Sequence, residues 1–139
     1  MAIIFTVIEQ ILNICSNGIQ KINCEKDKKK YAIDINDIYY IEWVDNLSCI
    51  YTAKEIYTTS QTLTKLEQQL DETIFVRVSK PMLINIYKIK SISSSFNMKL
   101  SAKLINNELV NISRHYRGNL LNSIHNLGKK EKNNEKKYL

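Results

Sequence analysis

Short runs in which apolar and polar residues alternate follow one another along most of the chain. A two-residue period is typical of β-strands that bury one face, and these runs are rich in β-branched and aromatic residues. Residues that favour turns separate the runs, at 26–30, 45–46, 79–81 and 106–107. The pattern predicts roughly eight short strands, drawn from segments 22–25, 31–35, 38–43, 48–52, 55–58, 75–78, 89–93, 98–104 and 108–112. The short apolar segment 82–86 stays unassigned.

Three stretches depart from this period. Apolar residues recur at helical spacing from Ile3 to Cys15 and stop before Gly18, so residues 1–18 are predicted to form an amphipathic helix. Leucines at 63, 66 and 70, behind a possible N-cap at Ser60 or Thr62, predict one short internal helix. Residues 114–127 are expected to begin with a short helical turn or helix, and the Lys/Glu/Asn tail over 128–139 is expected to be disordered.

The 139 residues suit a single domain, here placed at 19–127, which can bury a core without disulfides or metal. The net charge of +6 is unevenly spread. Residues 31–76 carry two basic residues against eight acids, whereas residues 77–117 carry eight basic residues against Glu108 alone. This asymmetry is typical of a one-sided surface that binds a polyanion.

Several classes of function find no support in the residues. The three cysteines (Cys15, Cys24 and Cys49) show no zinc-site spacing and favour a reducing compartment, so a cytoplasmic location is expected, with no metal and no cofactor. The apolar N-terminal stretch is too short to span a bilayer and lacks a signal peptide's basic start and cleavage site. Phosphate-binding loops and catalytic motifs are absent from the sequence, so an enzyme is not expected.

Several short motifs occur in a fixed order. They are Asp37-Ile38-x-Tyr40-Ile41-Glu42, Ile50-Tyr51-Thr52, Thr62-Leu63-x-x-Leu66-Glu67-x-x-Leu70, Phe75-x-Arg77-Val78-Ser79-Lys80-x-x-Leu83-Ile84-Asn85 and Ile112-Ser113-Arg114-x-Tyr116. In this combination, over residues 20–126, the sequence resembles the LytTR family of DNA-binding domains of bacterial transcription regulators. The resemblance implies a mainly β fold: an elongated stack of small antiparallel sheets with one short internal helix, to which residues 1–18 add an N-terminal amphipathic helix.

The resemblance also implies that loops, rather than a recognition helix, read successive major grooves of duplex DNA. Carried onto this chain, the first loop falls at Asn46-Leu47-Ser48, where Ser48 departs from the basic or histidine side chain of some members. The second falls at Ser79-Lys80-Pro81, and Pro81 departs from the more usual serine. The third holds Arg114, with His115 beside it and Arg117 one helical turn further on.

Physical chemistry supports basic side chains in these loops, since Arg and Lys reach guanine O6 and N7 in a major groove. The other lysines of residues 77–117 are expected to contact phosphate and carry no sequence information. These are Lys88, Lys90, Lys99 and Lys103.

The resulting hypothesis is a sequence-specific regulator that binds double-stranded DNA and no small-molecule substrate or membrane. About 20 residues before the match cannot hold a receiver domain. The N-terminal helix suggests a homodimer on paired half-sites. Two alternatives stay open: an RNA-binding β module, which should show aromatic residues on its basic face, and a protein-interaction module that acts through the N-terminal helix.

Overall fold

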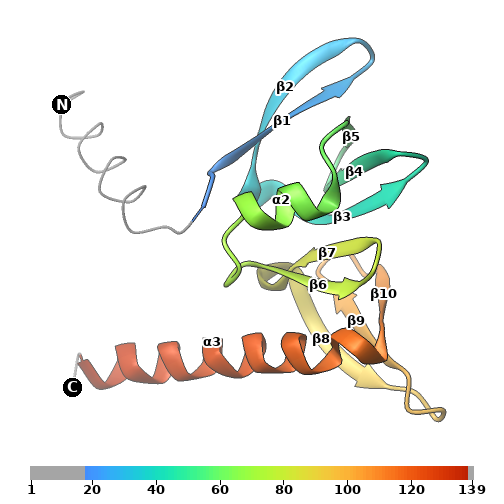
Figure 1. Ribbon diagram of the computed structural model, residues 1–139. Helices are drawn as coiled ribbons and strands as arrows, with labels where there is room; N and C mark the ends of the chain where they lie inside the picture. The colour runs from blue at the N-terminus through green and yellow to red at the C-terminus, as the bar shows by residue number, and fades with distance from the viewer. Residues whose placement is uncertain (1–17, 138–139) are drawn as a thin grey trace.

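The computed structural model describes residues 18–137 and consists of two antiparallel sheets with two helices (Figure 1). The larger sheet has seven strands in the order β2-β1-β5-β4-β3-β7-β6, and the smaller has three in the order β10-β9-β8. The expectation of a mainly β stack of antiparallel sheets with one short internal helix is therefore confirmed. The predicted helix over residues 1–18 lies outside the described residues, apart from Gly18, and so does any dimer contact that it makes.

The strands agree with the alternating segments, with small shifts at their ends. Their bounds are β1 Lys21–Lys26, β2 Lys29–Asp34, β3 Ile38–Val44, β4 Leu47–Thr52, β5 Ile56–Thr59, β6 Phe75–Ser79, β7 Met82–Asn85, β8 Ile89–Ser94, β9 Leu100–Leu104 and β10 Leu109–Ile112. Helix α2 covers Leu63–Gln69, and α3 covers Arg117–Lys137. Short 3-10 turns precede β3 (η1, Ile35–Asp37), β8 (η2, Ile86–Lys88) and α3 (η3, Arg114–Tyr116).

The hairpin turns follow from residues that tolerate a positive φ. Asp27 and Lys28 close β1–β2 with φ values of 50° and 64°, and Asp45 and Asn46 close β3–β4 with 51° and 64°. Two consecutive residues with positive φ match the right-handed twist of paired strands, which explains the short, sharp hairpins. In α2, the hydroxyl of Thr62 accepts a hydrogen bond from Lys65 N at 3.2 Å, so Thr62, rather than Ser60, is the N-cap.

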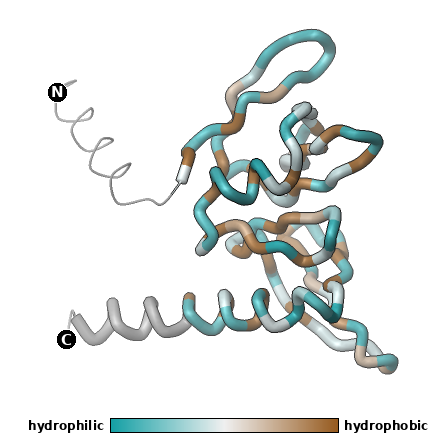
Figure 2. The backbone as a smooth tube through the Cα atoms, viewed as in Figure 1, coloured by the Kyte–Doolittle hydropathy of each residue, from teal (hydrophilic) through white to brown (hydrophobic). Residues whose placement is uncertain are grey.

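The seven-stranded sheet buries both of its faces around β3, β6 and β7. Leu83 packs with α2 residues such as Leu66 on one face, whereas its neighbour Ile84 packs toward the small sheet on the other. Because neighbouring residues of β7 face two different cores, the segment shows no polar alternation, and this is why the sequence left it unassigned. Figure 2 shows hydrophobic residues recurring where β6 and β7 lie beside β8–β10.

Helix α3 lies against β6, and its fully buried Leu120 belongs to the core between β6–β7 and the small sheet. The helix continues to Lys137, so the expectation that residues 128–137 are disordered differs from the structure. Lys and Glu are good helix formers and no proline follows Pro81, so a helix that has begun on the core can continue through this polar stretch. Among the described residues, no helix is long and apolar enough to cross a membrane.

Candidate nucleic-acid interface

Two turns between strands and one junction that follows a strand lie at one edge of the molecule, seen on the right of Figure 1. They are the β3–β4 turn, the β6–β7 turn and the β10–η3 junction, and we call this the loop edge. Trp43 N donates to Pro81 O at 2.8 Å and joins the first connection to the second. Ser113 N donates to Val78 O at 2.8 Å and joins the second to the third. Backbone hydrogen bonds therefore fix the order and spacing of the three loops that the family resemblance singled out.

The β6–β7 turn is held from inside by Arg77. Its Nε donates to Ser79 O at 3.2 Å and to Lys80 O at 3.0 Å, and its Nη2 also donates to Lys80 O. Its Nη1 forms an ion pair with Glu67 of α2 at 2.6 Å. The guanidinium thus binds the carbonyl groups of the turn, and Lys80 at the turn is exposed.

The third loop presents Arg114 and His115 on a single turn of 3-10 helix. Both side chains are exposed, and the His115 ring meets the Tyr116 ring edge-on at 4.8 Å between centroids. Arg117 differs, because its Nη2 donates to Met98 O at 2.5 Å and its Nε is buried. Arg114 and His115 are therefore available to a ligand, while Arg117 anchors the β8–β9 loop to the start of α3.

The first loop offers less than the resemblance implied. Asn46 is exposed at the tip of its turn, but Ser48 is fully buried and its hydroxyl donates to Gln61 O at 2.7 Å. Strand alternation places Ser48 inward, where the hydroxyl satisfies a backbone carbonyl from the segment that leads into α2. The Ser48 side chain is thus absent from the accessible surface of this loop.

Sheet topology divides the four lysines expected to contact phosphate. Lys99 precedes β9 at the end of the small sheet where Leu100 pairs with Ile112, next to the third loop. The other three lie toward the opposite end of that sheet: Lys88, Lys90 and Lys103. The ammonium of Lys88 also stands 5.3 Å from the centre of the Tyr39 ring, a cation–π distance. Only Lys99 therefore joins the loop edge.

Glu108, the one acid of residues 77–117, lies away from the loop edge. Glu108 lies in the β9–β10 turn, at the end of the small sheet opposite Arg114. The pKa of Tyr40 is raised well above its usual value, first by burial and then by the negative charge of the Glu108 carboxylate. A hydrogen bond between the two side chains raises it further. Within residues 77–117, which include Lys80, Lys99 and Arg114, there is no other acid, and the acid of the loop edge itself is Asp45, exposed in the β3–β4 turn.

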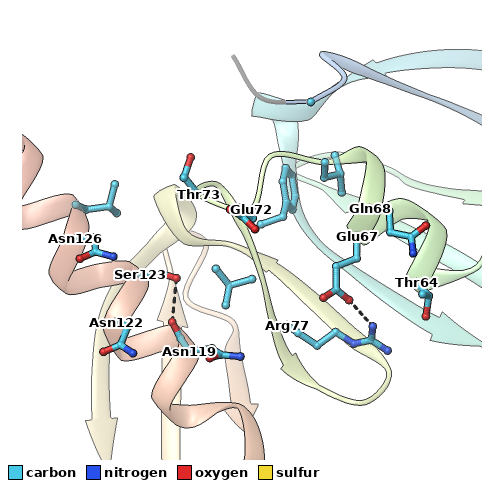
Figure 3. A pocket seen from close by; sticks show the side chains of 15 residues that line it. Thr64, Glu67, Gln68, Glu72, Thr73, Arg77, Asn119, Asn122, Ser123 and Asn126 are labelled. Atoms are coloured by element: carbon cyan, nitrogen blue, oxygen red, sulfur yellow. Dashed lines mark hydrogen bonds and ion pairs between the residues drawn. The ribbon is translucent and has the colours of Figure 1, made fainter. Parts of the chain in front are cut away.

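The structure also has an open groove of about 1220 Å³ between α2 and α3. Figure 3 shows amide and hydroxyl side chains from both helices along it, with the Glu67–Arg77 ion pair on one wall. Among the described residues that line it, Arg77 is the only basic one, and Glu67 and Glu72 are acidic. The groove therefore lacks the positive charge that a nucleic-acid site needs.

Sequence reasoning missed Arg77 as part of the site and counted it only as one positive charge. Within Phe75-Val76-Arg77-Val78, Arg77 shares a face with Phe75, which is buried against α2. A cation on a core-facing position, opposite a glutamate of the preceding helix, was the signal that could have revealed its role.

Both the sequence and the fold of this chain match known proteins. Residues 28–125 match the family model described as the LytTr DNA-binding domain. The sensory transduction protein LytT of Enterococcus faecalis is 28% identical and aligns with 79% of this chain and 50% of its own length. The transcriptional regulatory protein YpdB of Escherichia coli is 33% identical over 55% of this chain and 31% of its own length. The chain thus spans half or less of these two relatives.

A solved structure shares the fold. The LytTr DNA-binding domain of a putative methyl-accepting/DNA response regulator from Bacillus cereus superposes with a TM-score of 0.72 at 18% identity. The match covers 77% of this chain and 98% of that one. The family match extends over most of the described residues and includes every strand except β1, together with all three connections of the loop edge. The chain belongs to the LytTR family of DNA-binding domains.

Proposed function

We propose that this protein is a sequence-specific transcriptional regulator that reads the major groove of duplex DNA through its loop edge. One observation carries the proposal: the loop edge presents Lys80 and Arg114, both exposed, on turns whose backbones are fixed by hydrogen bonds. Reading a base pair requires that a donor be held in place before it meets the groove, because ordering a mobile loop lowers affinity.

Each side chain has a role that its chemistry suits. The Arg114 guanidinium donates two parallel hydrogen bonds to guanine O6 and N7, the commonest specific contact in a major groove. Lys80 donates to a guanine or to an adjacent acceptor in the next stretch of groove. Asn46 and His115, which are exposed beside them, add polar contacts. Lys99 neutralises phosphate and contributes affinity without sequence preference.

An RNA-binding module is the weaker candidate. Recognition of single-stranded RNA uses several aromatic side chains as a stacking platform. The exposed aromatic residues of the described chain are Tyr31, Tyr87 and Phe96. Only Phe96 lies at the same end of the small sheet as Arg114, so such a platform is not assembled at the loop edge.

The regulator proposal has two further parts. A protein that acts on chromosomal DNA works in the bacterial cytoplasm, so that location is part of it. Dimerisation through residues 1–18 stays a prediction, and comparing the size in solution of the full chain with a chain that starts at Gln20 tests it.

Selection from a pool of randomised duplexes tests the main proposal. The full chain should enrich a defined sequence, and Arg114→Ala and Lys80→Ala should each weaken binding to that sequence about ten- to hundred-fold, with relaxed preference at one base pair. Lys54→Ala is a charge-matched control, because Lys54 is exposed in the β4–β5 turn at the other end of β4. Failure to enrich any duplex sequence, or equal binding by all three variants and the parent, would refute the proposal.

A further inference from the structure

The β8–β9 hairpin ends in an apolar tip that the family match alone does not explain. Phe96 has a relative exposure of 104% and Met98 of 70%, the two most exposed large hydrophobic side chains among the described residues. The tip is an ordered turn, since Ser95 N donates to Lys99 O at 2.8 Å and Met98 N donates to Ser95 O at 2.9 Å. We call residues 95–99 the apolar tip.

The apolar tip adjoins the third loop of the loop edge. Ser94 pairs with Leu100, and Leu100 pairs with Ile112, so the tip and the residue before Ser113 lie at one end of the small sheet. Arg117 closes the remaining distance with its hydrogen bond to Met98 O. In Figure 1 the hairpin projects past the start of α3, beyond the rest of the sheet.

The charges around the apolar tip restrict what it can contact. Lys99 belongs to the tip and is exposed, and Arg114 lies at the same end of the sheet. Between residues 73 and 127 the only acid is Glu108, which lies at the far end of the sheet. Two exposed apolar side chains beside the cations Lys99 and Arg114 suit a partner that combines negative charge with apolar surface. Duplex DNA does so in its minor groove, where phosphates border sugar faces and base edges, and Phe and Met side chains are known wedges there.

From this arrangement, and on the basis of the function proposed above, we propose that the apolar tip is a fourth DNA contact, in which Phe96 inserts into the minor groove beside the bases read by Arg114. Lys99 binds the phosphates at the edge of that groove. Met98 covers the adjacent sugars. The contact lies outside the major-groove site, so it extends the bound sequence on one side and favours base steps that open easily.

The experiment measures affinity of the full chain for the selected duplex, with flanking base pairs removed one at a time from each end. Phe96→Ala should weaken binding to the long duplex roughly ten-fold without changing the salt dependence, since no charge is lost. Phe96→Trp should retain the affinity. On duplexes shortened past the tip on one side, parent and Phe96→Ala should bind equally. Leu109→Ala is the matched control, because Leu109 is also exposed but at the opposite end of the small sheet.

The outcomes separate this inference from the proposed function. If Phe96→Ala binds the long duplex as the parent does, while Arg114→Ala is weakened, the tip proposal is wrong and the proposed function stands. If neither the parent nor any variant prefers a duplex sequence, the proposed function itself fails. If Phe96→Ala changes the oligomeric state or the binding of a protein partner and leaves DNA affinity unchanged, the tip is a protein contact and the proposal is overturned.

Discussion

Replacing Arg77 with lysine keeps the positive charge of this position and removes the forked donor that holds the β6–β7 turn. Lysine carries a single ammonium on a flexible stem, so it cannot bind Ser79 O, Lys80 O and Glu67 together as the guanidinium does. The substitution therefore tests whether the conformation of the turn, rather than the charge, determines how Lys80 meets DNA.

The structure sets the size of the effect on stability. A hydrogen bond from a charged donor contributes about 1.5–3 kcal/mol, but the turn is exposed and water can replace the lost partner. The ion pair adds at most about 1 kcal/mol, because the Glu67 side chain is 44% exposed. We expect Arg77→Lys to lower the free energy of unfolding by about 1–2 kcal/mol, which leaves the domain folded.

A double-mutant cycle on DNA affinity then measures whether Arg77 acts by positioning Lys80. If Arg77 acts by placing Lys80, Arg77→Lys should weaken specific binding in the parent and have almost no further effect in the Lys80→Ala background. Glu67→Gln is the control, because it removes the ion pair and keeps the hydrogen bonds to the turn. Urea unfolding confirms that each variant is folded under the binding conditions. Full additivity of the two substitutions would refute the positioning role of Arg77.

Two further predictions concern the core. Asn85 is buried, and its side chain donates to Ile38 O at 2.9 Å and accepts from Tyr87 N at 3.0 Å. Asn85→Ala should therefore lower the free energy of unfolding in urea by about 2–4 kcal/mol. A loss below about 1 kcal/mol would show that these two hydrogen bonds do not hold the segments together. Burial raises the pKa of the Cys24 thiol from 9.0 to about 11. Between these values the unfolded chain releases a proton that the folded chain keeps, so stability is full below pH 9 and falls as the pH rises toward 11. Cys24→Ala should reduce that fall in the urea midpoint, and an identical fall in both proteins would count against it.

The sequence predicted most of the fold because its signals are local. The turn at Asp45-Asn46 needs a positive φ that Asn and Asp tolerate, and the N-cap at Thr62 requires only a hydroxyl before an apolar stripe. Strand β7 was harder, because a strand buried on both faces has no polar alternation to read.

The candidate site depended more on tertiary structure. Lys80 and Arg114 could be proposed from their motifs, and the structure leaves both exposed on the loop edge. Ser48 could not be judged, because the carbonyl that its hydroxyl binds belongs to Gln61, 13 positions away. The role of Arg77 likewise depends on α2 packing beside the turn.

The lysines show the same limit. Lys88, Lys90, Lys99 and Lys103 look equivalent in sequence, and only the register of the small sheet assigns Lys99 to one end and the others toward the opposite end. The apolar tip shows the same limit, since the sequence placed Met98 in the predicted strand 98–104 and Phe96 just before it, and only the structure shows both side chains exposed outside β9.

If the loop edge reads a DNA sequence, Arg114→Ala should lower the ratio of affinities for the selected and a scrambled duplex. Affinity is measured for the selected duplex and for a scrambled duplex of equal length, over a series of salt concentrations. We expect the parent to prefer the selected duplex strongly and Arg114→Ala to lose about ten- to hundred-fold of this preference. The slope of log affinity against log salt concentration should fall by about one or less. An unchanged preference in Arg114→Ala, with only uniformly weaker binding to both duplexes, would contradict this expectation.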